Sequence, residues 1–432
     1  MTDTTERLHK GVDLFAVVAL GLGTAVGVAI FSVIAPATGL AGPAMLLSVL
    51  IAAIPMFVIA VTYAFMGSAL PTSGASFEWS RRFIHPFVGF LIAWMRIVSN
   101  IGAILVLALV MVRYLSMVVP LPTKPAMAAT FVLLFLANYF GVGIAARLQV
   151  VLMGALVVLF AIYAAWGLPS VQPAHFEPLL PNGWGGVFAA VPLLIGLFFG
   201  IEAATEIGDE VKDGRKSIPL GIALSILSAV ALYLMVAFVT LGVLGAPGLA
   251  GSETPVLDAA KPFMGPLATP VIVTAAVVAI GKSINSLYLG FSRNLFAMAR
   301  AGMLPAALTA VHPKYGTPHV ALISILVAAL LGLFLPMNLT SLFLAVNIPT
   351  LLKYAATSLS AVVVVKKHPE IYESARFKLS PRTTILWAYL GAGASVVVAL
   401  MGLSADWTPY AALGVWALIG IAYYFVQGRR AA

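Results

Sequence analysis

Long apolar stretches alternate with short polar breaks along the whole chain. A helix that crosses the hydrocarbon core of a bilayer needs about 20 predominantly apolar residues. Twelve segments meet this requirement, at 14–39, 43–70, 86–119, 126–145, 148–168, 185–207, 218–245, 268–298, 318–336, 339–365, 384–403 and 407–427. The pattern therefore predicts an all-α polytopic membrane protein with twelve transmembrane helices.

The composition agrees with a chain embedded in lipid. Hydrophobic residues make up 62% of the sequence and charged residues 9%, whereas a soluble domain has about 45–50% apolar and about 25% charged residues. The 38 Gly and 27 Pro residues are spread through hydrophobic runs, which excludes a disordered or fibrous protein. Cysteine is absent, so disulfides, thiolate nucleophiles and cysteine metal sites are excluded as well.

The positions of the charged residues predict the orientation of the chain. The 24 Lys and Arg and 15 Asp and Glu residues give a formal net charge of +9. With the N-terminus inside, the cytoplasmic loops hold most basic residues and the outer loops hold only Lys124 and Lys261. This asymmetry satisfies the positive-inside rule. It predicts a multi-pass protein of the cytoplasmic membrane with both termini in the cytoplasm, whose partners are lipid and small solutes and not nucleic acid.

Three glycines interrupt the first hydrophobic segment. Gly21, Gly23 and Gly27 lie within seven residues of one another. Glycine leaves the helical conformation at little cost, so the helix can unwind there and direct backbone N–H groups into a cavity, as the discontinuous helices of transporters do. Close helix packing through small residues explains the same glycines. The pattern alone fits both explanations.

The sixth segment contains two further glycines and an acidic residue. Gly196 and Gly200 precede Glu202, which lies well before the charged loop that begins at Glu206. An acidic residue inside a hydrophobic segment is costly and is by default a candidate functional group. A structural carboxylate bound to backbone or hydroxyl groups is the alternative. Segments one and six are five apart, which is the spacing of two inverted five-helix repeats that each open with a broken helix.

This spacing predicts the organisation of the chain. A cytosolic tail covers residues 1–13, the first repeat covers 14–168 and the second covers 169–367. Residues 368–432 hold a cytosolic loop, helices eleven and twelve and a short C-terminal tail. The longest breaks between segments are too short for a separate domain, so the chemistry must lie inside the helix bundle.

Further polar residues lie inside hydrophobic segments. Lys282 is too far from either end of segment eight to reach water easily, so it faces the bundle interior or water. Lys353 follows Pro349 in segment ten and fits either a pocket or the inner membrane interface. Arg96 and Arg113 in segment three fit anchors or structural partners better than ligand contacts.

The sequence gives little support for enzyme chemistry. No phosphate-binding loop of the GxxxxGK[ST] type occurs, which argues against an ATP-driven pump. The histidines fall in loops or at helix ends, and they are His9, His85, His175, His312, His319 and His368. No cluster of histidines or carboxylates suggests a metal or a cofactor. A transporter is favoured over a channel. A channel would be distinguished by a current much larger than the turnover of a carrier.

Four stretches of the chain match short motifs at corresponding topological positions. They are Gly23 to Phe31, similar to G-(S/A)-x-x-G-x-G-I-F; Pro71 to Phe77, similar to P-x-x-G-G-x-Y; Phe198 to Pro219, similar to F-x-G-(F/V)-(D/E) followed by E-E-V-K-N-P-x-R-x-I-P; and Ser292 to Pro305, similar to S-R-x-x-x-x-x-x-R-D-G-x-L-P. Together they resemble the amino acid/polyamine/organocation (APC) transporter superfamily over nearly the whole chain. The resemblance implies an amino acid permease-like protein with a five-plus-five inverted-repeat core of the LeuT type, broken helices one and six, and two appended helices.

The resemblance also implies the residues of a substrate site. In that superfamily, backbone N–H groups of the broken first helix hold the substrate carboxylate, and carbonyls of helices one and six meet its amino group. The matching residues are Gly23, Thr24, Ala25, Gly27, Val28, Ala29, Phe198, Phe199, Gly200 and Ile201, with Asn100, Asn285 and Asn347 as further pocket lining. Half-helix ends favour these charges, because N-terminal ends attract anions and C-terminal ends attract cations. Glu202 matches the acidic position that links proton binding to gating.

Two positions depart from the superfamily pattern. Ala29 replaces a second glycine, so a methyl group enters the space above the carboxylate site, and the substrate is small there or binds in another pose. In sodium-coupled relatives helix eight helps to bind sodium against helix one, and some sodium-independent members place a lysine of helix five there. Helix five has no lysine here. We therefore hypothesise that the Lys282 ammonium takes the sodium position, holds helix one to helix eight and is a candidate proton carrier.

The charges inside the membrane predict the class of substrate. The hydrophobic segments contain the basic residues Lys282, Lys353 and Arg96 but one clear acidic residue, Glu202. No second carboxylate is therefore present to neutralise a second amine of a polyamine. The sequence therefore predicts sodium-independent, proton-coupled transport of neutral, zwitterionic amino acids by alternating access. The alternatives are an amino acid exchanger, a transporter of amines, or a transporter of anionic amino acids or organic acids in which Lys353 meets a second carboxylate.

Overall fold

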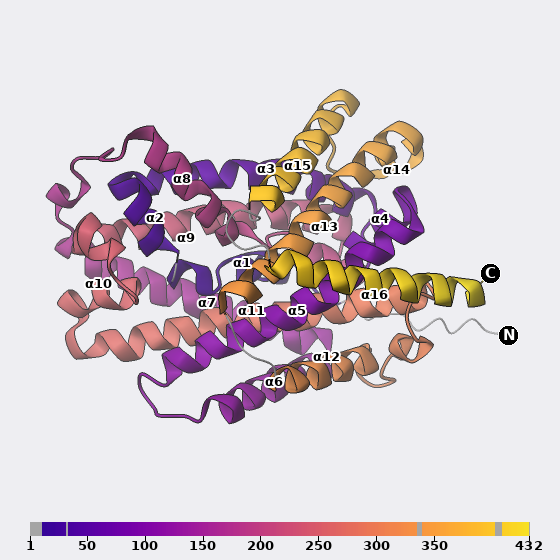
Figure 1. Ribbon diagram of the computed structural model, residues 1–432, viewed down its shortest axis with the longest axis horizontal. Helices are drawn as coiled ribbons and strands as arrows, with labels where there is room; N and C mark the ends of the chain where they lie inside the picture. Colours follow the sequence, from indigo (N-terminus) through magenta and orange to yellow (C-terminus); the bar gives the residue numbers. More distant parts are fainter. Residues whose placement is uncertain (1–10, 32, 335–338, 402–407, 432) are drawn as a thin grey trace.

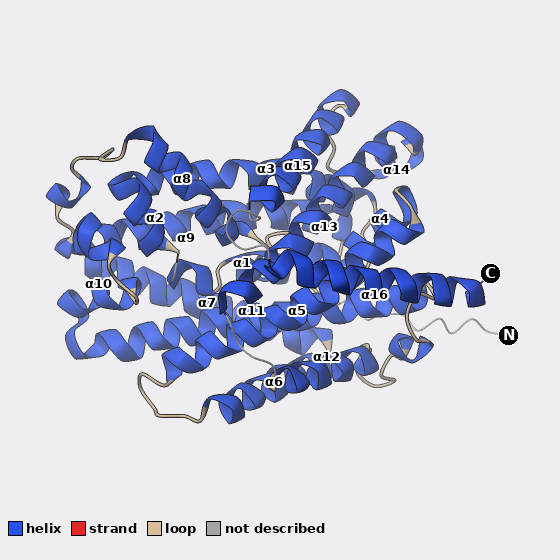
Figure 2. Ribbon diagram, viewed as in Figure 1, coloured by secondary structure: helices blue, strands red, loops and turns tan. Residues whose placement is uncertain are grey.

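The computed structural model describes residues 11–31, 33–334, 339–401 and 408–431. Within these ranges the chain forms helices joined by turns, as Figure 2 shows. Two isolated bridges, Val12 with Val211 and Ser73 with Ile207, are the sole strand-type pairings of the described residues. The prediction of an all-α protein is thereby confirmed. Most of the predicted cytosolic tail, residues 1–10, lies outside the described residues.

The described residues form sixteen α-helices. They are α1 Leu14–Ala25, α2 Ile34–Ala41, α3 Met45–Ala69, α4 Ala75–Phe83, α5 Pro86–Leu115, α6 Thr123–Tyr139, α7 Val142–Gly167, α8 Gly183–Ile195, α9 Gly214–Ala250, α10 Pro255–Met264, α11 Ala268–Arg300, α12 His319–Gly332, α13 Leu339–Lys367, α14 Pro369–Ser374, α15 Pro381–Met401 and α16 Thr408–Ala431. Short 3-10 turns connect several of them, at η1 Val28–Phe31, η2 Gly42–Ala44, η3 Leu168–Ser170, η4 Pro173–Phe176, η5 Gly196–Phe198, η6 Ala203–Glu206, η7 Gly208–Glu210, η8 Gly265–Leu267 and η9 Ala306–Thr309.

Within the described residues, each predicted hydrophobic segment overlaps helical structure. The first coincides with α1 and α2 together, and the sixth coincides with α8 and the turns that follow it. Eight stretches of the described residues are long and apolar enough to cross a membrane: Leu14–Phe31, Ile34–Ala69, Pro86–Leu115, Val142–Ser170, Gly214–Ala250, Pro255–Arg300, Val346–Lys367 and Pro381–Leu400. His319–Gly332 and Tyr410–Val426 are shorter apolar helices. The hydrophobic pattern does not predict α4, α10 and α14, because these helices are too short to fill a membrane-spanning window.

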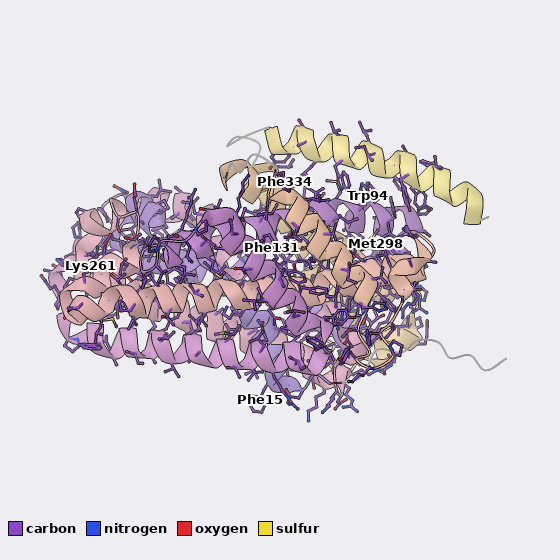
Figure 3. The ribbon with its side chains drawn as sticks, turned by 90° about the horizontal axis from the view of Figure 1, so that it is seen from below. Phe15, Trp94, Phe131, Lys261, Met298 and Phe334 are labelled. Atoms are coloured by element: carbon purple, nitrogen blue, oxygen red, sulfur yellow. The ribbon has the colours of Figure 1, made fainter. Side chains whose placement is uncertain are left out.

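The outer surface of the bundle carries large apolar side chains. Phe15 is 78% exposed and points away from the ribbon in Figure 3. Leu133, Leu331 and Leu418 are likewise exposed on three other helices. A soluble monomer rarely leaves so much apolar surface in contact with water, so this surface is suited to hydrocarbon. The all-round hydrophobicity of the helices therefore follows from their having lipid on one side and protein on the other.

Most helices run along the long axis of the molecule, with α10 near one end and α4 near the other (Figure 1). Helix α1 lies inside the bundle, where it contacts α7, α9 and α11. Helix α13 packs against α5 and α15. The end of α1, where the backbone becomes irregular, is thus buried in protein and shielded from the hydrocarbon.

Helix α16 is attached to the bundle through a pair of tryptophans. The indole N–H of Trp94 on α5 donates to the Trp416 carbonyl at 3.0 Å, and the indole N–H of Trp416 donates to the Trp94 carbonyl at 2.9 Å. The two rings stack with their centroids 4.7 Å apart. Gly420, one turn after Trp416, leaves the space that the Trp94 ring occupies, since a Cβ there would lie 2.4 Å from Trp94 Cδ1.

Replacing Gly420 by alanine is expected to destabilise the protein by about 1–3 kcal/mol, the usual cost of overpacking a site that cannot adjust. The Trp94 ring cannot move away freely, because Trp416 and Tyr423 stack against it. Gly414→Ala is the matched control, because a Cβ at Gly414 meets nothing within 4 Å. Thermal unfolding of the purified variants in detergent measures both changes. Equal melting temperatures for the two variants would contradict the packing argument.

Candidate functional site

The first broken helix ends inside the bundle. Helix α1 stops at Ala25, and the chain continues through η1 before α2 begins at Ile34. The glycines of this region also allow close approach of neighbouring side chains. A Cβ at Gly23 would lie 2.0 Å from Gln149 Nε2, and one at Gly27 would lie 2.9 Å from Ser283 Oγ. Both explanations of the glycines, an interrupted helix and close packing, therefore hold at the same place.

The second broken helix meets the first. Helix α8 stops at Ile195, and residues 196–210 run in 3-10 turns instead of a continuous helix. Gly200 has φ +98, a conformation that side-chain-bearing residues rarely adopt. A Cβ on Gly200 would lie 2.2 Å from Thr24 Cγ2, and one on Gly21 would lie 2.5 Å from the Ile201 carbonyl oxygen. The two breaks thus face each other across a contact that only glycine permits.

Lys282 lies against the end of α1. Its side chain is fully buried on α11, and its ammonium donates to the Gly23 carbonyl at 2.8 Å and also to the Val26 carbonyl. The hydroxyl of Ser283 donates to the same Gly23 carbonyl at 2.9 Å. The last carbonyls of a helix carry partial negative charge and attract cations. The structure therefore joins α1 to α11 through a built-in ammonium, which is the contact that the sequence-based hypothesis requires.

Neutral side chains bind the preceding carbonyls of α1. Gln149 on α7 donates from Nε2 to the Ala19 carbonyl at 3.1 Å and to Ser286 Oγ at 2.9 Å. Asn285 donates to Gln149 Oε1 at 2.8 Å and to the Ala145 carbonyl at 3.1 Å, and its Oδ1 accepts from Asn138 at 2.9 Å. This amide network joins α6, α7 and α11, and it fixes the face of the bundle on which α1 lies.

Glu202 is bound by two residues of α13. Its Oε1 forms an ion pair of 2.5 Å with Lys353, and its Oε2 accepts a hydrogen bond from the Tyr354 hydroxyl at 2.9 Å. The side chains of Glu202 and Lys353 are each 3% exposed. The Tyr354 oxygen also accepts from the Gly200 N–H at 3.2 Å. Glu202 therefore binds an ammonium and a hydroxyl group of a distant helix, as the structural explanation of this carboxylate requires, and its role in gating stays a prediction.

Two more carboxylates follow Glu202 at four-residue intervals. Glu206 accepts from Arg96 on α5 at 3.1 Å and from Ser76 Oγ at 2.6 Å. Glu210 accepts two hydrogen bonds from Arg293 on α11, at 2.6 and 2.9 Å, and both side chains are fully buried. The structure thus pairs Arg96 with Glu206, in agreement with its expected role as a structural partner. We call Glu202, Glu206 and Glu210, with their three cations, the ion-pair ladder.

The remaining predicted residues of helices one and six lie in the breaks themselves. Ala25 is buried at the end of α1, while Val28 and Ala29 belong to η1. The ring of Phe198 packs edge-on against that of Tyr233, with the two ring centroids 5.5 Å apart, and the ring centroids of Phe199 and Tyr354 are 5.9 Å apart.

The three predicted asparagines differ in their surroundings. Asn100 is buried on α5, and its Nδ2 has no hydrogen-bond partner among the described residues. Asn347 is half-buried on α13, beside Val346, whose carbonyl accepts from Ser99 at 2.9 Å. Asn285 uses its amide in hydrogen bonds with Asn138 and Gln149. The structure therefore brings Thr24, Gly200, Ile201, Gly23 and Lys282 together, and the Asn285 amide is already bound by protein groups.

Several residues of this centre are not predicted as site residues from the sequence. They are Tyr354, Gln149, Asn138, Ser283, Glu206, Glu210 and Arg293. The repeat of Glu at four-residue intervals is the one signal that points to the ladder, because buried carboxylates need cations as partners. Nothing in the sequence shows which cation each carboxylate meets.

A separate cavity of about 350 Å³ lies between α3, α7 and α9. It is lined by Leu46, Ala164, Leu168, Leu234, Met235, Phe238 and Val239. These apolar side chains offer no group that recognises a charged amine or carboxylate. The polar centre at the two breaks is therefore the candidate functional site.

Comparisons with known proteins show the family of the chain. The family model described as amino acid permease matches residues 12–426. The chain is 27% identical to the branched-chain amino acid permease BcaP of Bacillus subtilis, over 99% of this chain and 95% of that protein. It is 28% identical to the methylthioribose transporter of Bacillus subtilis over the same shares. It is 23% identical to the glutamate/serine transporter AimA of that organism, over 86% of this chain and 74% of the relative.

Breaking the Glu210–Arg293 pair is expected to destabilise the protein. Arg293→Met leaves a buried carboxylate without its cation, at a cost of about 3–5 kcal/mol. The double variant Glu210→Met with Arg293→Met removes both charges and should cost clearly less than the sum of the two single changes. Thermal unfolding in detergent gives the three values. Additive costs would mean that the two residues do not stabilise each other.

Proposed function

The chain belongs to the amino acid permease family of the APC superfamily, and we propose that it is a secondary active transporter of neutral amino acids. Membership of this family makes the chain a multi-pass membrane transporter and not an enzyme. The observation that carries the proposal is the meeting of two broken helices at Thr24 and Gly200 inside the bundle. Irregular backbone at membrane depth is tolerated where it is buried in protein or lines a water-filled cavity, and transporters use it to bind substrate.

The proposed architecture has twelve transmembrane helices. Residues 14–168 form the first five-helix repeat, residues 169–367 form the inverted second repeat, and two helices follow. In support, the start of α1 and the end of the second broken segment lie side by side, since the Val12 N–H donates to the Glu210 carbonyl and the Lys212 N–H donates to the Val12 carbonyl. Lys261, in a predicted outer loop, and Met298, near the predicted inner loop, lie toward opposite ends of the molecule (Figure 3).

The proposed substrate site lies at the two breaks. The backbone of Thr24 to Ala29 receives the substrate carboxylate, and carbonyls of residues 198–201 meet its amino group. The Gly23 carbonyl, which the sequence also predicts for the amino group, already accepts from Lys282 and Ser283. Carbonyl groups suit the amino group, because free carbonyls at irregular backbone attract cations. Asn100 supports this assignment, because its buried Nδ2 is free of partners among the described residues and can donate to a substrate. Asn347 is a further lining residue.

The charges around the site favour a zwitterion without a charged side chain. Glu202 is already neutralised by Lys353, and Glu206 by Arg96. Neither carboxylate is therefore free to bind a second amine, and Lys353 is not free to bind a second carboxylate. The branched-chain amino acid permease among the relatives is consistent with an uncharged side chain.

Lys282 supports sodium-independent transport. Its ammonium binds the Gly23 and Val26 carbonyls, between α1 and α11, where it supplies the positive charge that a sodium ion would bring. Lys282 and Glu202 are the two groups that we propose to link proton movement to the change in access. The ion-pair ladder closes the cytoplasmic side in this arrangement, because it ties the segment after α8 to α5, α11 and α13.

Transport is tested with the purified protein in liposomes. Labelled leucine is expected to accumulate in sodium-free buffer when the outside is more acidic than the inside, and added sodium should not increase the rate. Collapse of the proton gradient should abolish accumulation. Uptake that requires sodium would contradict the proposed coupling, and uptake only into liposomes preloaded with amino acid would identify an exchanger.

Lys282→Met is expected to lower gradient-driven leucine uptake by about tenfold or more, because it removes a charged group that binds two buried carbonyls. Lys367→Met is the control, since Lys367 is exposed at the end of α13. Initial rates in the same liposomes measure both variants, after gel filtration has verified that each is folded. Full proton-driven uptake by Lys282→Met would refute its role in coupling.

A further inference from the structure

Lys353 is an unusual residue for the interior of a membrane protein. It lies in the middle of α13, and its ammonium contacts the Glu202 carboxylate at 2.5 Å. The same ammonium lies 4.7 Å from the ring centroid of Tyr354 and 5.7 Å from that of Tyr63. Aromatic faces attract cations through the negative charge of their ring faces. The lysine is therefore held in one place by a carboxylate and two rings.

This lysine adjoins the backbone of the second break. Tyr354, the next residue in the chain, connects the Gly200 N–H to Glu202 Oε2 through its hydroxyl group. The Tyr354 ring also packs against Phe199, which lies in the same break. The ion pair, the tyrosine and residues 199–202 thus form one continuous unit. A substrate side chain that extends from the breaks toward α13 would meet this unit.

A carboxylate at this position would by itself attract cationic substrates. A charge buried away from water is costly until it finds a partner of opposite sign. The side chain of lysine or ornithine carries such a partner at its end. Lys353 competes with it at an advantage, because a tethered ammonium has a far higher effective concentration beside Glu202 than any dissolved substrate.

The neighbouring charges do not take part in the competition between Lys353 and a cationic substrate for Glu202. Arg96 and Glu206 are the nearest further ionisable pair, and they bind each other at 3.1 Å. Lys282 points to the carbonyls of α1 and brings another positive charge to the centre. Among these groups, removal of Lys353 would therefore expose one carboxylate, and removal of Glu202 would expose one ammonium.

Resting on the proposed function, we propose that Lys353 is a specificity-determining residue that excludes amino acids with cationic side chains. Its ammonium occupies the Glu202 carboxylate that such a side chain would otherwise bind. The pair restricts the site in the opposite direction as well, because Glu202 keeps Lys353 from binding the second carboxylate of an acidic amino acid. Selectivity for neutral side chains then depends on a pair that contributes no net charge.

The test compares ligands that differ in one charged group. L-Lysine and L-norleucine have side chains of similar length. A ligand that binds the folded protein stabilises it by RT ln(1 + [L]/Kd), so its affinity is obtained from the dependence of the melting temperature on ligand concentration. Dose-dependent melting shifts are measured in detergent for the wild-type chain, for Lys353→Met, and for the double variant Glu202→Gln with Lys353→Met.

The single variant is expected to gain affinity for lysine relative to norleucine by about tenfold or more, as for a newly formed buried charge pair. The double variant should show no such gain, because it has no free carboxylate. An unchanged ratio in Lys353→Met, or an equal gain in the double variant, would overturn the proposal. The response of the wild-type chain to norleucine reports separately on the proposed function, since its absence would contradict neutral substrates whatever the variants do.

Glu202→Gln provides a second measurement that keeps Lys353 in place. This variant leaves the ammonium without its acid, so it is expected to gain affinity for L-2-aminoadipate, an acidic analogue of similar length, relative to norleucine. It should not gain affinity for lysine. If Lys353→Met does not fold, this variant decides the proposal, and a failure to discriminate between 2-aminoadipate and lysine would refute it.

Discussion

Three buried carboxylates each require a cation, and this requirement determines how the second broken segment is held in the protein. After α8 the chain has no continuous helix to fix its path. Glu202, Glu206 and Glu210 occur at equal intervals along this irregular segment, and their partners come from α13, α5 and α11. An unpaired charge in this interior would cost several kcal/mol. The ion pairs of its side chains therefore position this segment. An ordinary helix, in contrast, is positioned by its backbone hydrogen bonds and its apolar face.

Helix α1 is held in a different way, which has consequences for movement. Its carbonyls accept hydrogen bonds from the neutral side chains of Gln149 and Ser283, and a single ammonium, that of Lys282, lies at its end. Water can replace neutral hydrogen bonds at small net cost. Separation of a buried ion pair costs more, because both charges must find new partners. In the alternating access that we propose, α1 can therefore separate from α11 more easily than the ladder can open, unless a proton or a substrate charge takes the place of one of its members.

The sequence predicts the helices well and the contacts of their charged residues poorly. The membrane requires long apolar stretches, so the pattern predicts where helices such as α3 and α11 begin and end to within a few residues. The glycines indicate both breaks. The pairing of Glu202 with Lys353 joins positions 151 residues apart, and no local pattern contains that information. Asn285 illustrates the same limit, because its place in the chain suits a pocket residue, while its amide is bound by Asn138 and Gln149. Which face of a helix meets which neighbour is decided by packing, and packing is visible only in the folded protein.

The charges of the centre also explain why a zwitterion suits it. Among the buried Asp, Glu, Lys and Arg residues that the structure describes, Lys282 is the one without a partner of opposite charge, and carbonyl groups of α1 compensate its charge. A carboxylate bound near Thr24 would lie within a turn of those carbonyls and would gain from the nearby ammonium. A zwitterion supplies that carboxylate without changing the net charge of the interior. A cationic substrate would add a second excess positive charge, and an acidic one would compete with Glu202 for Lys353. The same arrangement of ions that holds the broken helices in place therefore also limits the charge of what can bind between them.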